Sequence, residues 1–245
     1  MWQENNQSIN LSVIVVAAGS GSRMQSSEHK QFLKLCGSPM LALTLQIFEN
    51  HPSVDEIILV SQKQELERVR IEILVPFKSR KVTQLVPGGA CRKDSVIAGL
   101  SSVSAKSDFI AIHDGARPLL TPEMFDRVLI EAVRKGGAIL AVPVTDTLKR
   151  TDARGLIRET VSRDRLWAAQ TPQVFRAEWL HDAYEKLPDS VVATDDASVM
   201  SMAGYPVHLA TGSWENIKVT VPDDLLLAEM ILEGRREIHA NRNRV

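Results

Sequence analysis

Short apolar segments alternate along this chain with longer segments whose apolar residues recur at helical spacing. The apolar segments cover residues 11–18, 56–61, 82–86, 109–113 and 138–144. Helical spacing marks residues 39–49, 92–103 and 122–134, and the last of these has Thr121-Pro122 at its start and Gly136-Gly137 after its end. Strands that alternate with helices pair in parallel, so this order predicts an α/β fold in which helices wrap a mostly parallel sheet.

The composition limits the classes to which the chain can belong. Its 245 residues, 44% hydrophobic and 24% charged, can bury one good core, and we expect a single domain over residues 1–245. A formal net charge of −1 gives no global attraction to nucleic acid. Cys36 and Cys91 are too few for a disulfide framework, and no apolar run is long enough to span a bilayer. We therefore expect a cytoplasmic protein that contacts neither nucleic acid nor membrane.

A glycine loop, Gly19-Ser-Gly-Ser-Arg-Met24, follows the first apolar segment, and Lys30 lies a few residues beyond it. Glycines let a loop bend over phosphate oxygens with bare N–H groups pointing inward, and Arg23 and Lys30 add two cations. The loop is not a dinucleotide fingerprint, because Met24 stands where the third glycine belongs, and it lacks the Gly-Lys-Ser/Thr of a Walker loop. We expect a nucleoside triphosphate site, although an ordinary connection with exposed cations fits this loop alone equally well.

Two further turns are expected at the same edge of the sheet, because ligands of parallel sheets lie beyond the carboxyl ends of the strands. Gly88-Gly89 precedes a helix that starts near Arg92 and Ser95, where the helix dipole favours an anion or a polar base edge. Asp114 follows the fourth apolar segment and is suited to hold a ribose hydroxyl or to orient magnesium. Arg117 is suited to grip a phosphate. Each also has an ordinary interpretation as a turn, cap or surface residue.

More candidate residues follow in the second half of the chain. Thr171 opens a turn before a strand at 174–175, Thr194 is expected to cap a helix, and Lys218 is expected on a strand at 216–220. A last helix is predicted from Pro222 to Ala240. The sequence has no G-x-S-x-G motif and its six histidines lack ligand spacing, which argues against triad hydrolysis and zinc catalysis. A phosphate nucleophile would need no general base, only positioning and charge neutralisation.

Residues 145–170 interrupt the alternation of strands and helices. This segment is polar, carries the turn signal Asp152-Ala-Arg-Gly155, and contains candidate strands at 147–150 and 157–161. A two-stranded ribbon is marginally stable alone, so we expect a β-hairpin arm for dimerisation that packs on a second subunit; a flexible surface insertion is the alternative. The whole chain is then expected to form a Rossmann-like three-layer sandwich with a mostly parallel twisted sheet and a projecting β-hairpin arm.

Taken in order, these motifs closely resemble those of the 2-C-methyl-D-erythritol 4-phosphate cytidylyltransferases. The resemblance runs from about Val13 to the last helix. A chance match of this many motifs, in the same order and spacing, is unlikely, so the resemblance is specific to this family. They are Ala17–Met24 with Lys30-Gln31, Gly88–Ser95, His113–Pro118, Asp146-Thr147, Arg163–Trp167, Gln170–Gln173, Thr194-Asp195 and Asn216–Thr220. The resemblance implies a nucleotidyltransferase that joins CTP to methylerythritol phosphate and releases pyrophosphate, as part of the non-mevalonate route to isoprenoids.

The same resemblance implies a role for each group of candidate residues. The nucleoside part of CTP would be held by Ala17, Ala18, Gly19, Gly89, Ser95, Asp114 and Gly115. The catalytic cations around the α-phosphate would be Arg23, Lys30 and Lys218. Methylerythritol phosphate would be framed by Arg117, Thr147, Arg163, Thr171 and Thr194, with Thr147 and Arg163 contributed by the arm of the partner subunit. Mg²⁺ would bridge the triphosphate, and the sequence assigns it no protein ligand.

The chain departs from the usual family pattern at a few positions. Val16 and His29 stand where the family commonly has proline, Ala90 where an acidic residue is common, and Gly115 where alanine is frequent. Backbone contacts are expected to survive, while the shape of the loop is left open. Some families fuse a cyclodiphosphate synthase domain behind this one; since this chain ends after its last helix, we expect a monofunctional enzyme.

Three alternatives remain at this point. A ribitol 5-phosphate cytidylyltransferase shares the fold and most phosphate contacts, and a non-catalytic regulatory module would bind CTP without releasing pyrophosphate. The third alternative is an NAD-dependent oxidoreductase. In such enzymes the second strand ends in an acidic residue that binds the ribose of NAD, whereas the second predicted strand of this chain ends in Val60-Ser61. The motifs around Arg92, Arg163 and Gln170 favour the methylerythritol phosphate enzyme over the ribitol phosphate enzyme.

Overall fold

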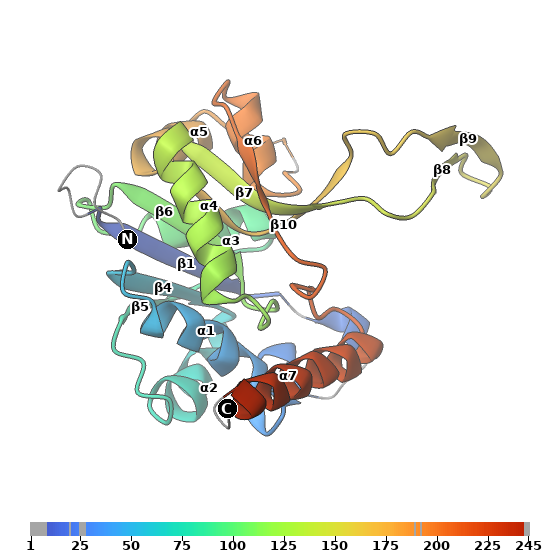
Figure 1. Cartoon of the computed structure of the whole chain (residues 1–245). Coiled ribbons are helices and arrows are strands. Elements are labelled where there is room, and N and C mark those ends of the chain that lie inside the picture. The colour runs from blue at the N-terminus through green and yellow to red at the C-terminus, as the bar shows by residue number, and fades with distance from the viewer. Residues whose placement is uncertain (1–8, 20, 25–27, 189, 192, 243–245) are drawn as a thin grey trace.

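A computed structural model describes residues 9–19, 21–24, 28–188, 190–191 and 193–242. At its centre lies a seven-stranded sheet in the order β11-β7-β10-β6-β1-β4-β5 (Figure 1). The strands are β1 (Leu11–Ala17), β4 (Glu56–Ser61), β5 (Val82–Pro87), β6 (Phe109–Asp114), β7 (Gly137–Pro143), β10 (Trp167–Arg176) and β11 (His208–Thr211). All five apolar segments that the sequence marks as strands lie in this sheet, so their prediction is confirmed.

Strand pairing is parallel everywhere in this sheet except at β10. β1 pairs in parallel with β4 and β6, β4 with β5, and β7 with β11. β10 runs antiparallel to both of its neighbours, β6 and β7. The reason is the connection, because β7 reaches β10 through a hairpin-like excursion, which reverses the chain, and not through a crossover helix. The sheet is therefore mostly parallel, as expected.

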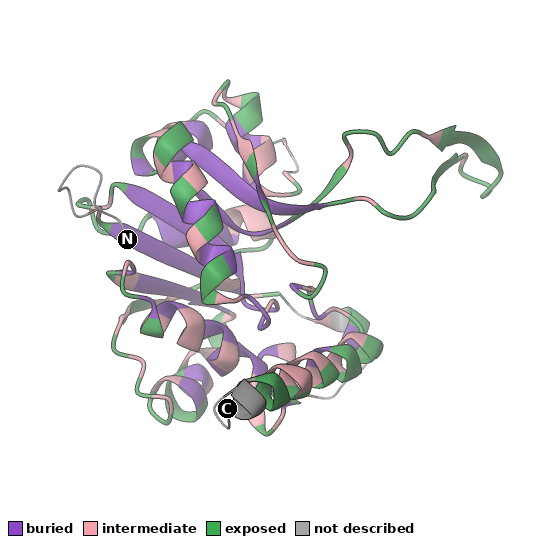
Figure 2. Cartoon of the chain, viewed as in Figure 1, coloured by how far each residue is buried: buried purple, intermediate pink, exposed green. Residues whose placement is uncertain are grey.

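Helices cover both faces of the sheet and complete the three layers. One face carries α1 (Met40–Asn50), α2 (Leu66–Val69) and α4 (Pro122–Lys135), and the other carries α3 (Arg92–Leu100), α5 (Ala177–Glu185) and α6 (Asp196–Met202). Successive side chains of a strand point to opposite faces, so Val13 and Val15 of β1 join the first core while Ile14 joins the second. Figure 2 shows that the buried residues concentrate in the sheet and on the helix surfaces that face it.

Helix α4 begins and ends where the sequence indicates. The Thr121 hydroxyl oxygen accepts a hydrogen bond from the Met124 N–H at 3.3 Å, and Pro122 occupies the first turn. Gly136 then adopts a left-handed conformation with a φ of 91°, which a residue with a side chain rarely adopts, and it ends the helix. Local sequence alone therefore sets both ends of α4.

Several short elements and a last helix complete the structure. They are η1 (Ser22–Met24), η2 (Lys30–Phe32), β2 (Lys34–Leu35), β3 (Ser38–Pro39), η3 (Lys63–Glu65), η4 (Arg70–Leu74) and α7 (Pro222–Arg242). Ala228 of α7 packs with Met24, Leu35 and Met40 in a small core of its own. None of the helices in the described part of the chain is long and apolar enough to cross a membrane.

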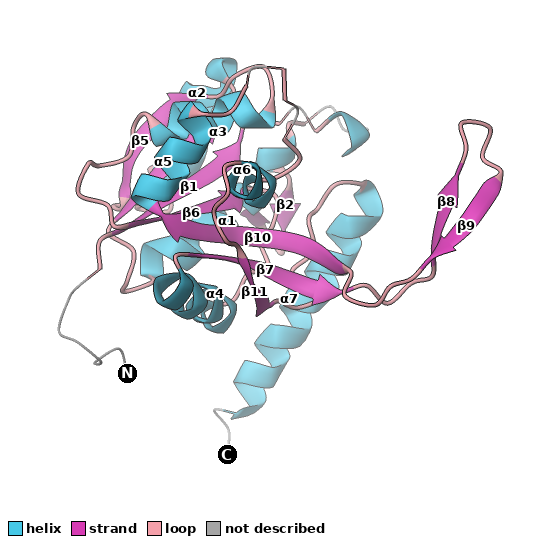
Figure 3. Ribbon diagram, turned by 90° about the horizontal axis from the view of Figure 1, so that it is seen from above, coloured by secondary structure: helices cyan, strands magenta, loops and turns pink. Residues whose placement is uncertain are grey.

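The arm leaves the body between β7 and β10 and extends away from all the helices (Figures 1 and 3). Its tip is a ribbon of β8 (Leu148–Thr151) and β9 (Ile157–Val161), paired antiparallel. The turn forms as the sequence predicts, with Gly155 at a φ of 82° and the Asp152 carboxylate accepting the N–H groups of Arg154 and Leu156. The last residues of the predicted arm belong instead to the main sheet, because Trp167 pairs with Pro143.

Two predicted elements differ from the structure. Asn216–Thr220 does not form a strand, since this segment is irregular between β11 and α7. The N-cap of α6 is Asp195, whose carboxylate accepts the Ser198 N–H at 3.0 Å, and not Thr194, which is exposed one residue earlier. Strand β11 at the sheet edge was missing from the prediction altogether.

Candidate active site

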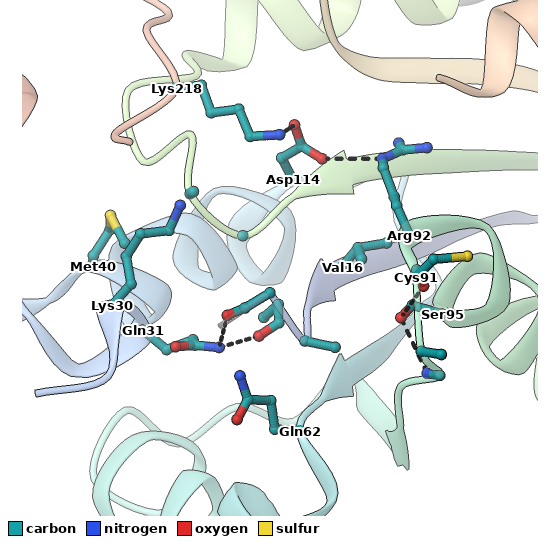
Figure 4. A pocket seen from close by; sticks show the side chains of 17 residues that line it. Val16, Lys30, Gln31, Met40, Gln62, Cys91, Arg92, Ser95, Asp114 and Lys218 are labelled. Atoms are coloured by element: carbon teal, nitrogen blue, oxygen red, sulfur yellow. Dashed lines mark hydrogen bonds and ion pairs between the residues drawn. The ribbon is translucent and has the colours of Figure 1, made fainter. Parts of the chain in front are cut away.

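A pocket of about 430 Å³ opens at the carboxyl ends of β1, β4, β5 and β6 (Figure 4). Nine of the predicted site residues line it: Ala17, Ala18, Gly19, Lys30, Gly89, Ser95, Asp114, Gly115 and Lys218. They come from segments far apart in the sequence. The three loops that the rule for parallel sheets assigns to one edge therefore line one pocket.

The loop after β1 is held in shape by Gln31, whose position next to Lys30 gave no hint of this role. The buried Gln31 amide N–H₂ donates to the carbonyl oxygens of both Ala17 and Gly19. Gly21 has a φ of 66°, and a Cβ on it would lie 3.0 Å from the Lys30 Cβ. The loop thus bends back against Lys30, as an anion cradle requires.

The turn between β5 and α3 forms the opposite wall of the pocket. A Cβ on Gly88 would lie 2.3 Å from the Ala18 Cβ, so only glycine lets the two turns approach this closely. The Ser95 hydroxyl accepts the Gly89 N–H at 3.2 Å and donates to the Cys91 carbonyl at 3.0 Å. The start of α3 consequently presents backbone and hydroxyl groups to the pocket.

Asp114, at the end of β6, is surrounded by cations. Its Oδ2 lies 2.8 Å from the Lys218 Nζ and 3.7 Å from the Arg117 Nε, and its Oδ1 lies 3.6 Å from the Arg92 Nε. Burial alone would raise the pKa of Asp114, but these cations, Lys218 foremost, hold it well below its ordinary value. Asp114 is therefore an anion that organises the basic side chains around it.

Lys30 and Lys218 point into the same pocket from different segments. The Lys30 Nζ donates to the Val219 carbonyl at 2.9 Å, which ties η2 to the segment that carries Lys218. Burial lowers the pKa of Lys30 to about 8, and the charges of Lys218 and Arg23 act in the same direction. Arg23 itself is exposed in η1 and does not line the pocket, although its charge reaches Lys30.

The lowered pKa of Lys30 predicts how anion binding depends on pH. Below pH 8 the ammonium is present, whereas above pH 8 a bound triphosphate must draw one proton from solution. For the expected ligand, CTP, Kd should then rise by up to about tenfold per pH unit above 8. Calorimetry at several pH values should detect this rise in the wild type, and Lys30→Arg, which keeps its charge, should flatten it. A rise of equal slope in both proteins would contradict the assignment to Lys30.

His113 links β6, β10 and the turn that carries Arg117. Its Nε2 lies 3.1 Å from the Arg117 carbonyl and its Nδ1 lies 3.0 Å from the Thr171 hydroxyl, which in turn accepts the Asp114 N–H at 3.1 Å. These partners fit a neutral ring that donates from Nε2 and accepts at Nδ1. Burial lowers the pKa of His113 to about 4, which keeps the ring neutral.

This neutral histidine predicts a loss of stability in mild acid. Between about pH 6.5 and 4 the unfolded chain takes up a proton on His113 and the folded chain does not, so stability falls as the pH falls. The full effect is about 3 kcal/mol, from about 1.4 kcal/mol per pH unit. Denaturant unfolding at pH 7 and 4.5 should show it in the wild type and in the control His181→Gln, which changes an exposed ring. It should be largely absent in His113→Gln; an unchanged acid effect there would refute the prediction.

Asn216 is a further residue that sequence reasoning missed, because it was assigned to a strand. It is fully buried, and its side-chain amide donates to the Thr171 carbonyl at 3.0 Å. The backbone carbonyl of Asn216 accepts a hydrogen bond from the Arg117 guanidinium at 2.7 Å. The Arg117 Nε–H is buried and has no hydrogen-bond partner among the described residues. Asn216 thus holds together Arg117 and Thr171 and fixes the segment that leads to Lys218.

Besides Arg23, three predicted site residues lie outside this arrangement. Thr147 and Arg163 are exposed on the arm, where the Arg163 guanidinium donates to the Thr145 carbonyl. Thr194 is exposed before α6 and does not line the pocket. Within a single subunit, therefore, the arm residues are not brought to the pocket.

Comparisons with known proteins agree with this geometry. The profile of the 2-C-methyl-D-erythritol 4-phosphate cytidylyltransferase family matches residues 11–234. Proteins of that name from Syntrophus aciditrophicus (strain SB) and Alkaliphilus metalliredigens (strain QYMF) are 45% identical over 226 residues and 42% identical over 228 residues. These alignments cover 91% and 93% of this chain, and 97% and 95% of the relatives.

A solved structure gives the same result for the fold. The 4-diphosphocytidyl-2C-methyl-D-erythritol synthase from Anaerococcus prevotii DSM 20548 is similar with a TM-score of 0.80 and 29% sequence identity. The match covers 93% of this chain and 100% of that one. Because the family profile and these relatives extend over most of the sequence, the chain belongs to the 2-C-methyl-D-erythritol 4-phosphate cytidylyltransferase family.

Proposed function

We propose that this chain transfers the cytidylyl group of CTP to 2-C-methyl-D-erythritol 4-phosphate. The products are 4-diphosphocytidyl-2-C-methyl-D-erythritol and pyrophosphate, in the non-mevalonate route to isoprenoids. The observation that carries the proposal is the convergence of Lys30 and Lys218 on one pocket, beside the glycine loop that follows β1. Family membership supplies the identity of the two substrates.

The nucleotide occupies the pocket between the two glycine turns. Its triphosphate lies against the backbone of Ala17, Ala18 and Gly19, where bare N–H groups favour an anion. Its cytosine faces Gly89 and Ser95 at the start of α3, and its ribose faces Asp114 and Gly115. All of these residues line the same pocket, which supports a single binding mode.

Catalysis rests on positive charge at the α-phosphate. The phosphate oxygen of methylerythritol phosphate attacks the α-phosphorus of CTP in line, and pyrophosphate leaves from the opposite side. Lys30, Lys218 and Arg23 neutralise the charge that builds on the equatorial oxygens in the transition state. Arg23 is exposed in the free enzyme, so this role requires its side chain to turn toward the triphosphate.

A divalent cation fits this site through the nucleotide. Among the described residues, no group of three or more His, Cys, Asp or Glu side chains is arranged to hold a metal. Asp114 is the carboxylate among the residues that line the pocket, and Mg²⁺ characteristically binds one or two carboxylates together with substrate phosphates. The triphosphate oxygens, with Asp114 nearby, would hold Mg²⁺, which supplies further charge neutralisation when bound.

The second substrate lies between the rim of the pocket and an arm. Arg117, whose Nε faces the Asp114 carboxylate at 3.7 Å without a hydrogen bond, and Thr171 contribute from the body, and Thr194, exposed before α6, is the third contact proposed there. Thr147 and Arg163 come from the arm of the partner subunit in a homodimer. Exposed apolar side chains support this docking, since Leu156 and Ile157 at the tip are each 57% exposed in the single chain.

A pyrophosphate-release assay tests the proposal directly. The enzyme is supplied with CTP and Mg²⁺ and either methylerythritol phosphate or ribitol 5-phosphate, with UTP in place of CTP as a third arm. We expect rapid release with CTP and methylerythritol phosphate. Preference for ribitol 5-phosphate would overturn the substrate assignment, and CTP binding by calorimetry without any release would indicate a regulatory module.

A further inference from the structure

A buried series of polar groups connects the outer helix layer to the pocket. The Tyr184 hydroxyl of α5 donates to the Asp196 Oδ1 of α6 at 2.6 Å. Both Asp196 carboxylate oxygens accept from Arg92, with N–O distances of 3.0 and 2.6 Å. Arg92, the first residue of α3, then faces Asp114 in the pocket (Figure 4). Neither Tyr184 nor Asp196 lines the pocket, so any effect they have on the reaction must be indirect.

Asp196 is placed firmly enough to act as an anchor. It is fully buried, and burying a carboxylate is costly unless it is paired. The start of α6 is fixed to β10 by Gln173, whose amide donates to the Asp195 carboxylate at 3.0 Å and accepts the Ala197 N–H at 2.8 Å. The position of the Asp196 carboxylate is therefore set by the sheet.

The anchor determines where the Arg92 guanidinium points. Because its two terminal nitrogens are occupied by Asp196, the remaining Nε–H lies toward the Asp114 Oδ1, at 3.6 Å. Although burial acts to lower it, the Asp196 carboxylate raises the pKa of Arg92 above its ordinary value. Arg92 is thus a permanent cation with a fixed orientation.

A fixed Arg92 matters because Lys218 has two uses. In the free enzyme its Nζ is paired with the Asp114 Oδ2 at 2.8 Å, yet the proposed reaction needs the same ammonium on a phosphate. Lys218 is 40% exposed and can turn, whereas Asp114 is only 10% exposed and cannot be left without a cation at low cost. Arg92 on the Oδ1 side lowers the cost of this transfer.

From this geometry we infer that Tyr184 and Asp196 are positioning residues, which hold Arg92 against Asp114 so that Lys218 is free to move to the nucleotide phosphate. The inference rests on the proposed CTP site and adds to it two residues from α5 and α6, in the helix layer that also contains α3. Without the Tyr184 hydroxyl, the Asp196 Oδ1 loses one of its two hydrogen-bond donors, so the paired carboxylate and Arg92 guanidinium are no longer held where Arg92 faces Asp114. Asp114 in turn retains Lys218, and CTP binds more weakly.

The chain contains a matched control for this test in Tyr205. Its hydroxyl also donates to a carboxylate of the same layer, the Asp182 Oδ2 at 2.8 Å, but this pair has no connection to Arg92. Tyr184→Phe and Tyr205→Phe therefore remove the same chemical group. We expect Tyr184→Phe to raise the Kd for CTP by about tenfold and Tyr205→Phe to leave it within about twofold of the wild type.

Calorimetry with CTP and Mg²⁺ separates positioning from simple unfolding. Loss of folded protein lowers the binding stoichiometry and leaves Kd unchanged, whereas loss of positioning raises Kd at full stoichiometry. In an Asp114→Asn background Tyr184→Phe should have no further effect, because the group through which it acts is gone. Arg92→Lys should also raise the Kd for CTP, because lysine cannot make the bidentate pair with Asp196. This variant repeats the test if Tyr184→Phe folds poorly.

The outcomes are distinct. A wild type that fails to bind CTP would refute the proposed function, not this inference alone. If the wild type binds, a Tyr184→Phe Kd equal to that of Tyr205→Phe would overturn the inference, as would an effect of Tyr184→Phe that persists unchanged in the Asp114→Asn background.

Discussion

Lys30→Ala should lower kcat by about 10²-fold or more while leaving the fold intact. Loss of a well-placed donor in a site built on charge neutralisation typically costs this much. Lys30 is suited to such a role because it lines the pocket and is held by the Val219 carbonyl, so little reorganisation is needed when the reaction occurs. Pyrophosphate release at saturating substrate measures kcat, and thermal unfolding verifies the fold.

Lys34→Ala is the matched control, since Lys34 is exposed four residues later and lies outside the pocket. It should retain normal turnover. Arg23→Ala should also lose nearly all turnover. This expectation holds only if the side chain of Arg23, exposed in the free enzyme, contacts the triphosphate once it is bound. Turnover above half of the wild-type value in either Lys30→Ala or Arg23→Ala would remove that residue from the mechanism.

Mixing two inactive variants should restore activity if the arm works in the partner's pocket. Arg163→Ala alone should lower turnover by about 10²-fold, because the second substrate loses a phosphate contact. In a mixed dimer of Arg163→Ala and Lys30→Ala, one pocket carries both defects and the other carries neither. Random reassortment of equal amounts should therefore restore about a quarter of the wild-type activity.

The result distinguishes the two possible arrangements of the arm. If Arg163 served the pocket of its own subunit, every pocket in the mixed dimer would carry one defect and no activity would return. Two different pocket variants, Lys30→Ala and Lys218→Ala, provide the control, because their mixture leaves no pocket intact. Sedimentation of the wild type should show a dimer, and a monomer with full activity would contradict the proposal.

The strands and glycine turns were predictable because their signals are local. A buried parallel strand such as β1 is an apolar run whatever surrounds it, and close approach at Gly88 excludes every side chain. Once these elements were placed, the topology rule brought Lys30, Asp114 and the start of α3 to one edge. Sequence reasoning therefore located the pocket.

The errors arose where distant partners decide between local alternatives. Thr194, Asp195 and Asp196 can all cap a helix, and Gln173 of β10 settles the choice by binding Asp195 and the Ala197 N–H. The segment 216–220 has the pattern of a strand. It does not pair with the sheet, and its Asn216 instead hydrogen-bonds Arg117 through the backbone carbonyl and the Thr171 carbonyl through the side-chain amide. The roles of Gln31 and His113 also depend on residues distant in the sequence, since Gln31 binds the Ala17 carbonyl and His113 binds the Thr171 hydroxyl.

The antiparallel pair of β7 and β10 also affects how this protein can vary. Because the two strands leave the body side by side, their pairing inside the sheet is independent of what is attached beyond Pro143 and Trp167. Residues can be inserted or deleted in the excursion without changing any register in the core. Evolution can therefore adjust the reach of this appendage, and with it the spacing of the subunits in the proposed dimer, at little expense to folding.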